Sequence, residues 1–207
     1  MLQYTNRINF SSIQSYIMSL HKYNLKRNFD STTEPEGKIE KSKKELVFVV
    51  QKHAASHLHY DFRLEMNGML KSWAIPKGPS MNPADKRLAI MVEDHPYSYK
   101  DFEGTIPEGN YGAGKVIVWD NGTYTLADEQ NEHKIETILK SDLQKGHLSF
   151  ILKGKKLKGE FALVKLKTKQ ENTWLLIKKK DEFAIESDIL EENKSVISNL
   201  TLEAFDK

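Results

Sequence analysis

The stretch "LHYDFRLEM", residues 58–66, has an apolar residue at every second position. Successive side chains of a β-strand point to opposite faces, so this alternation predicts a strand with one apolar face and one polar face. The apolar face carries Leu58, Tyr60, Phe62 and Leu64, and the polar face carries His59, Asp61 and Arg63. An imidazole, a carboxylate and a guanidinium in one row, with an apolar face behind them, indicate a site built on a sheet.

Eight further short runs rich in β-branched and aromatic residues resemble this one, and turn signals such as "NG", "KG" and "DNG" separate them. They are "LVFVVQ" (46–51), "MLKSWAI" (69–75), "RLAIMVE" (87–93), "KVIVWD" (115–120), "GTYTLA" (122–127), "LSFIL" (148–152), "EFALVKL" (160–166) and "WLLIK" (174–178). So many short strands predict a mainly β, antiparallel fold, either a barrel or a sandwich.

Two segments predict peripheral helices. "SSIQSYIMSLHKY" (11–23) could form a short amphipathic helix, and "NEHKIETILKSDLQKG" (131–146) has apolar residues at helical spacing and Gly146 as its terminator. We therefore expect an N-terminal helix and polar arm over residues 1–44, a β domain over 45–186, and a C-terminal linker or tail over 187–207.

Composition limits the classes of function. Lys and Arg total 31 against 29 Asp and Glu, so a positive surface for an anionic partner has to be local. The chain has no cysteine, which excludes disulfides, thiolate metal sites and a cysteine nucleophile. With no signal peptide and no apolar run long enough for a membrane span, we expect a soluble, cytoplasmic protein without a membrane partner.

Three side chains suggest a metal site. His59 and Asp61 share one strand face, and the short turn "AASHL" can bring His53 back beside them. Two nitrogens and one oxygen suit a catalytic divalent cation. The alternative is that all three are surface groups of a half-exposed strand. His57 is the spare histidine, expected to point with the apolar set or to solvent.

Two further residues suggest an anion site beside the metal. Arg63 continues the polar face, where a guanidinium can clamp phosphate or carboxylate oxygens, although a salt bridge to Asp61 would also explain it. His95, in "VEDHPYSY", follows a strand at a sheet rim, where it could serve as a ligand, an acid, a phosphate donor or only a turn residue. "GNYGAGKV" (109–116) fails as a phosphate loop because Val116 replaces the required hydroxyl; its glycines predict a tight connection into a strand.

Two long stretches, "FVVQKHAASHLHYDFRLEMNGMLKSWAIPKGPS" (48–80) and "KRLAIMVEDHPYSYKDFEGTIPEGNYGAGKVIVWD" (86–120), closely resemble the 3'-phosphoesterase domain of bacterial and archaeal DNA ligase D. The resemblance runs from about Tyr23, through "KRNFDSTTEPEG", to "WLLIKKKDEFA". It implies a small β-barrel enzyme that uses a cation, typically Mn²⁺, with Co²⁺ or Zn²⁺ as other choices. Such enzymes remove a 3'-terminal ribonucleoside and then the 3'-phosphate, leaving a 3'-OH for ligation in double-strand break repair by end joining.

The resemblance also implies roles for individual residues. His53, His59 and Asp61 match metal ligands, and the positions matching the remaining active-site residues are Arg63, His95, Tyr99, Gln51, Lys77, Arg87, Glu93, Arg27 and Glu34. Asn28 departs from the family, which has Asp after that Arg, and the lost charge would weaken ribonucleoside removal more than phosphate removal. Implied partners are 3' ends of DNA or DNA/RNA primer-templates, with a separate ATP-dependent DNA ligase, a polymerase and a Ku-type end-binding protein.

Two other functions fit the same residues. A non-haem iron oxygenase would use His59 and Asp61 with His95 or His147 as its third ligand. A DNA-end-binding module that has lost catalysis is the second alternative.

Overall fold

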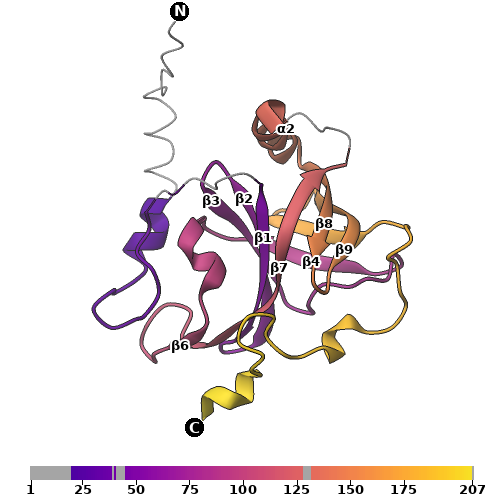
Figure 1. Ribbon diagram of the computed structural model, residues 1–207. Coiled ribbons are helices and arrows are strands. Elements are labelled where there is room, and N and C mark those ends of the chain that lie inside the picture. The colour runs from indigo at the N-terminus through magenta and orange to yellow at the C-terminus, as the bar shows by residue number, and fades with distance from the viewer. Residues whose placement is uncertain (1–19, 39, 41–44, 128–131, 207) are drawn as a thin grey trace, which may run out of the picture.

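The computed structural model describes residues 20–38, 40, 45–127 and 132–206. Most of the regular structure is β (Figure 1). The strands are β1 Val47–Ala54, β2 Leu58–Met66, β3 Met69–Ile75, β4 Lys86–Met91, β5 His95–Pro96, β6 Gly104–Ile106, β7 Gly114–Leu126, β8 His147–Gly154, β9 Lys158–Lys165 and β10 Thr173–Lys178. The helices are η1 Tyr97–Asp101, α2 Glu132–Lys145, η2 Ile189–Glu191 and η3 Leu202–Asp206, and residues 20–25 are also helical.

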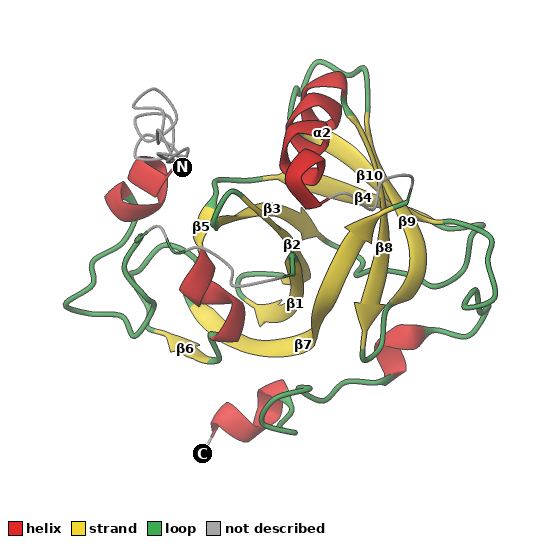
Figure 2. Cartoon of the chain, turned by 45° about the horizontal axis from the view of Figure 1, so that its top comes forward, coloured by secondary structure: helices red, strands yellow, loops and turns green. Residues whose placement is uncertain are grey.

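The sheet closes into a barrel. Its strand order is β1-β2-β3-β4-β10-β9-β8-β7, all pairings are antiparallel, and β1 also pairs with β7. Figure 2 shows the closed wall, with β6 continuing beyond β7 and β5 beside β3. The prediction of a mainly β antiparallel fold is confirmed, and closure decides for a barrel over a sandwich.

The hairpin of β1 and β2 fixes which residues face the same way. Its register places Gln51 opposite Asp61 and His53 opposite His59. β2 then turns into β3 through Asn67 and Gly68, both with positive φ, which is the backbone that a two-residue hairpin turn requires. The predicted alternation therefore holds along β2.

Two apolar layers lie on the two faces of this wall. One face points into the barrel, where Phe62 and Trp73 pack with side chains from all eight barrel strands. The other face carries Val49, Leu70, Val116 and Val118, covered by Tyr23, Tyr99, Phe102 and Ile106. Figure 1 shows η1 and the helix at 20–25 on this second side, away from β8 and β9. The polar row of β2 shares this second face, so it lies between the barrel wall and a covering layer.

Helix α2 confirms the predicted helix and its end at Gly146, which has a φ of 78°. The other predicted helix, over 11–23, lies outside the described residues except for 20–23, which are helical. The predicted turn at "DNG" (120–122) is wrong, because β7 runs through it without a break. Gly122 instead allows β7 and β8 to approach each other closely, because a Cβ added to it would lie 2.2 Å from the Lys153 carbonyl oxygen on β8.

Both flanks of the barrel pack against it. Tyr23 is fully buried in the second apolar layer. The backbone N–H of Val196 donates to the Val118 carbonyl, and the Trp119 indole N–H donates to the Glu192 carbonyl, which fastens the tail to β7. The boundaries expected near residues 44 and 186 stay predictions.

None of the helices in the described ranges has the length and apolar character needed to cross a membrane.

We predict that Gly114→Ala destabilises the fold by about 3 kcal/mol, whereas Gly109→Ala costs about 1 kcal/mol. Both glycines have positive φ, of 144° and 85°. A Cβ on Gly114 would lie 2.2 Å from the Ala54 carbonyl oxygen, while a Cβ on Gly109 meets no atom within 4 Å. Denaturant unfolding measures both free energies, and equal losses would contradict the close approach of β7 to β1.

Candidate metal centre

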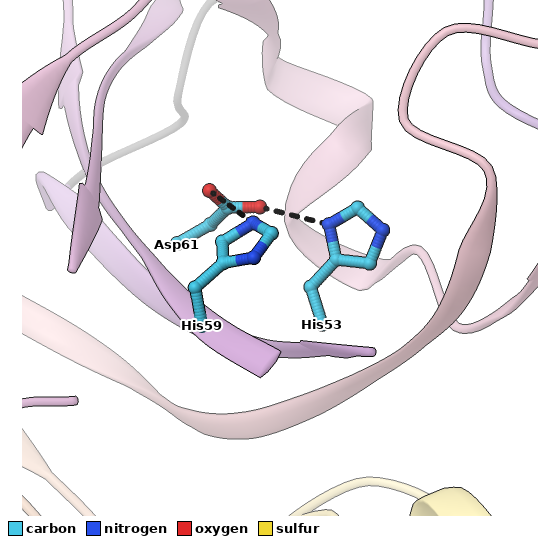
Figure 3. A group of neighbouring side chains, drawn as sticks. All are labelled: His53, His59 and Asp61. Atoms are coloured by element: carbon cyan, nitrogen blue, oxygen red, sulfur yellow. Dashed lines mark ion pairs between the residues drawn. The ribbon is translucent and has the colours of Figure 1, made fainter. Parts of the chain in front are cut away.

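Three side chains from the β1–β2 hairpin converge on one point. His53 comes from β1, and His59 and Asp61 come from β2. One ligand atom from each lies within 4.8 Å of the other two. Figure 3 shows both rings turned toward the carboxylate, with His53 Nδ1 3.6 Å from Asp61 Oδ2 and His59 Nε2 3.7 Å from Asp61 Oδ1. The convergence expected from the sequence is present.

A backbone carbonyl fixes the proton on each imidazole. His53 Nε2 lies 2.9 Å from the Gly112 carbonyl oxygen, and His59 Nδ1 lies 2.9 Å from the His57 carbonyl oxygen. A carbonyl oxygen can only accept, so these two nitrogens carry the protons of the neutral rings. The lone pairs therefore sit on His53 Nδ1 and His59 Nε2, the two nitrogens that face Asp61.

This arrangement fits a divalent cation. Two lone pairs and a carboxylate face one another across 3.6 and 3.7 Å, too far apart for hydrogen bonds. A metal-binding imidazole commonly donates its second N–H to a carbonyl, as both rings do here. Two imidazole nitrogens and one carboxylate suit manganese, zinc, cobalt or iron.

Asp61 is held as a carboxylate. It is 8% exposed, and Arg63 Nη2 donates to its Oδ2 at 3.0 Å. Burial by itself raises the pKa of Asp61, but opposing interactions, of which the charge of the Arg63 guanidinium is the largest, outweigh it and hold the pKa well below its usual range. The group is therefore ionised and available to a cation at neutral pH.

One guanidinium nitrogen of Arg63 makes no hydrogen bond to the described residues. Its Nε donates to Gln51 Oε1 at 2.8 Å and its Nη2 to Asp61, while Nη1 is buried without a hydrogen-bond partner in the described part of the chain. An unpaired N–H on a buried cation is costly, and an anionic oxygen is the partner that best satisfies it. The salt bridge to Asp61 is present as well, so the two interpretations of Arg63 from the sequence are compatible.

Gln51 positions this guanidinium. Its side chain is fully buried, and its amide N–H groups donate to the carbonyls of Tyr99 and Phe102 at 3.1 and 2.9 Å. The amide oxygen is thereby left to accept from Arg63. Gln51 thus links β1 and Arg63 to the η1 segment that covers the site.

His95 is a neutral ring with a defined tautomer. Its Nε2 lies 3.3 Å from Arg27 Nη2, and its Nδ1 lies 3.0 Å from the Glu93 carbonyl oxygen. A guanidinium only donates and a carbonyl only accepts, so Nδ1 carries the proton. Burial and the charges of Arg63 and Arg27 hold the pKa of His95 well below its ordinary value.

The N-terminal arm is tied into this cluster. Arg27 Nε and the Tyr99 hydroxyl both donate to Glu34 Oε1, at 2.8 and 2.9 Å. The Arg27 guanidinium stacks 3.7 Å from the Tyr23 ring centroid. The Tyr99 hydroxyl therefore faces the arm, and its ring lies 5.0 Å from the Arg63 guanidinium carbon.

The structure places the remaining expected site residues differently. Glu93 reaches the arm, accepting from Lys26 Nζ at 3.0 Å. Lys77 is exposed in the loop after β3. Arg87 on β4 pairs with Leu176 on β10, a residue that faces the barrel interior. The Arg87 guanidinium donates to Asp85 at 2.8 Å. Arg87 thus points to the face opposite the metal ligands, and no hydrogen bond or ion pair within the described ranges joins Lys77 or Arg87 to them.

Two contributors were missed because they act through the backbone. The carbonyls of His57 and Gly112 orient the imidazoles, whereas the His57 side chain is exposed. The cluster of glycines at 109–116 was a signal for a tight loop, and Gly112 has a φ of 76°. The residue types in the sequence give no signal that the His57 carbonyl orients the His59 imidazole.

The iron oxygenase alternative needs His95 or His147 as third ligand. His95 is engaged with Arg27 and Glu93, and His147 is exposed at the start of β8. His53 occupies the third position instead. The geometry therefore does not favour that triad.

Comparison with known proteins gives consistent matches. A family profile described as the DNA Ligase D 3'-phosphoesterase domain matches residues 51–165. The multifunctional non-homologous end joining protein LigD of Pseudomonas aeruginosa is 49% identical over 192 residues, which cover 88% of this chain and 22% of that protein. Its namesake from Mycolicibacterium smegmatis is 39% identical over 165 residues, or 79% of this chain and 21% of that protein. The chain spans about a fifth of the length of these relatives.

We predict that His59→Ala and Asp61→Ala each weaken Mn²⁺ binding by more than about 100-fold, since even an outer partner of a metal ligand is worth 10–100-fold. His57→Ala is the matched control, because it removes an exposed imidazole but keeps the carbonyl that orients His59. Isothermal titration calorimetry measures the affinities. Unchanged binding in either ligand variant would refute the assignment.

We predict that His95 remains neutral and protonated on Nδ1 at pH 6. Its pKa is lowered, so an unfolded chain takes up a proton as pH falls below about 6.5 and the folded chain does not. The stability that neutral His95 contributes is therefore present above that pH and declines below it. Long-range ¹H–¹⁵N NMR spectra report the tautomer, and a doubly protonated ring at pH 6 would contradict the burial.

Proposed function

The chain belongs to the DNA ligase D 3'-phosphoesterase domain family, and we propose that it hydrolyses phosphate esters at the 3' ends of DNA. The observation that supports this best is the pairing of two sites. Asp61 belongs to the cluster of three metal-type ligands and also accepts from Arg63, whose Nη1 has no hydrogen-bond partner in the described part of the chain. A cation and a guanidinium that share one carboxylate suit the charged oxygens of a phosphate ester.

The reaction has two stages. In the first, water adds to the phosphorus of the terminal phosphodiester and the bond to the terminal ribonucleoside breaks, leaving a 3'-phosphate. In the second, water adds to that phosphate and the P–O bond to the sugar breaks, giving a 3'-OH and inorganic phosphate. A divalent cation at His53, His59 and Asp61, Mn²⁺ by preference with Co²⁺ or Zn²⁺ as other choices, would polarise a phosphoryl oxygen and activate the water.

The protein's own groups bind and orient the phosphate. Arg63 donates from Nη1 to a phosphoryl oxygen, and Gln51 keeps the guanidinium plane fixed while it does so. Because Arg63 is buried beside apolar side chains, this interaction is stronger than it would be in water. Developing negative charge on the phosphoryl oxygens is stabilised by the same contact.

His95 supplies or withholds a proton according to what is bound. In the free protein its Nε2 accepts from Arg27 and has no proton to give. The negative charge of a bound phosphate favours the protonated ring. His95 then protonates the leaving oxygen from Nε2, and it regains a proton from the attacking water. The leaving oxygen is the 5' oxygen of the ribonucleoside in the first stage and the 3' oxygen of the strand in the second.

The arm makes the two stages differ. Arg27 and Glu34 reach His95 and Tyr99 from outside the barrel, so they suit the larger diester substrate with its extra nucleoside. Asn28, where the family has Asp, accepts from the Asp30 backbone N–H and brings no charge. We expect ribonucleoside removal to be the slower of the two activities. The partners are DNA or DNA/RNA primer-template 3' ends, and a separate ligase, polymerase and Ku-type end-binding protein act on the same ends.

The test is a metal-by-substrate screen on primers that end in a 3'-ribonucleotide or a 3'-phosphate. We predict that His95→Gln lowers the rate on both ends about 100-fold and leaves Mn²⁺ affinity unchanged, since His95 makes no hydrogen bond to the three ligands. His147→Gln is the matched control and keeps full activity, because its imidazole is exposed on β8.

Two results would overturn the proposal. Consumption of 2-oxoglutarate with iron, lost in His147→Gln or His95→Gln and without phosphate release, would favour the oxygenase. Tight binding of 3' ends without hydrolysis under any divalent ion would favour the inactive binding module.

A further inference from the structure

Tyr111 is an exposed aromatic residue beside the metal ligands. It lies in the loop between β6 and β7, and 49% of its surface is accessible. The carbonyl of the next residue, Gly112, accepts from the His53 ring. A Cβ added to Gly112 would lie 3.7 Å from His53 Cε1. The ring of Tyr111 is thus one residue away from a contact with a metal ligand.

Two basic residues of the arm contact the same ring. The Arg27 guanidinium carbon lies 5.8 Å from the Tyr111 ring centroid, and Arg27 Nη2 contacts His95. Lys26 Nζ donates to the Tyr111 hydroxyl at 3.2 Å. Tyr111 therefore neighbours both the metal ligand His53, through Gly112, and the Arg27–His95 pair.

The contacts of Tyr111 with the described residues leave about half of its surface open to solvent. Of the described aromatic residues only Tyr111 and Phe183 are exposed, and Phe183 lies against the Gly159 position on β9, away from the site residues. Lys26 Nζ is 4.3 Å from the Tyr111 ring centroid, which leaves much of the aromatic surface uncovered.

We propose that Tyr111 stacks on the nucleobase of the terminal nucleotide. This inference rests on the proposed function and adds how the substrate end is bound. The base is joined to the 3'-phosphate through a single sugar, so a phosphate held by Arg63 beside His95 places that base within reach of the neighbouring Tyr111 ring. Stacking on an aromatic face accepts every base, which suits an enzyme that has to treat ends of any sequence. Lys26 and Arg27 add positive charge beside the strand.

The experiment compares Tyr111→Ala, Tyr111→Phe and Tyr111→Trp on two 3'-phosphorylated strands. One ends in a normal nucleotide and the other in an abasic sugar. We predict that Tyr111→Ala raises KM on the normal end at least about tenfold, whereas the abasic end shows no such penalty. Phe and Trp restore KM because they keep an aromatic face. Phe183→Ala is the matched control for losing an exposed ring and leaves KM unchanged on both ends.

A binding readout separates this inference from the proposed function. The wild-type protein, without added metal, should quench the fluorescence of a terminal 2-aminopurine next to a 3'-phosphate, and Tyr111→Ala should not. Equal quenching by both proteins, or an equal KM penalty on the abasic end, would overturn the stacking role. Tyr111-dependent quenching with no hydrolysis by the wild type would support stacking and refute the proposed activity. Mn²⁺ affinity unchanged in Tyr111→Ala shows that Gly112 and His53 have kept their geometry.

Discussion

The structure around the site depends on one hairpin register and on two carbonyls that fix proton positions. The pairing of β1 with β2 places His53 and His59 opposite each other and Asp61 one row away. The carbonyls of Gly112 and His57 then take the two imidazole N–H groups, so that both lone pairs face the carboxylate. Three electron-rich atoms turned toward one point repel one another unless a positive charge lies between them, which makes a cation the natural occupant.

Burial between two apolar layers gives the neighbouring residues their properties. The barrel interior backs the wall on one side, and Tyr23, Tyr99 and Phe102 cover it on the other. Arg63 and His95 are therefore almost fully buried, with their hydrogen bonds set by Gln51, Asp61, Glu93 and Arg27. The Arg63 guanidinium is already oriented, so it can bind an anion without rearranging. An anionic oxygen would also give Nη1 the hydrogen-bond acceptor that it has not found in the described part of the chain.

The alternation of polar and apolar residues was enough to predict side-chain positions within the β1–β2 hairpin. It was not enough to predict contacts between residues that are far apart in the sequence. Alternation along residues 58–66 identified the faces of β2, and spacing brought His53 to the same place, because strand geometry alone determines both. The neutral tautomer of His95 could not be found that way, since it depends on Arg27, 68 positions earlier in the chain. The face of Arg87 and the continuity of β7 through "DNG" depend on pairing partners that no single run reveals. The resemblance to ligase D supplied the reaction, which no pattern of residues specifies.

The most direct measurement is anomalous diffraction from crystals of the protein grown with Mn²⁺. We expect one manganese peak bonded at about 2.2 Å to His53 Nδ1, His59 Nε2 and an Asp61 carboxylate oxygen. A peak bonded through His53 Nε2 or His59 Nδ1, or no peak among these three residues at saturating Mn²⁺, would contradict it.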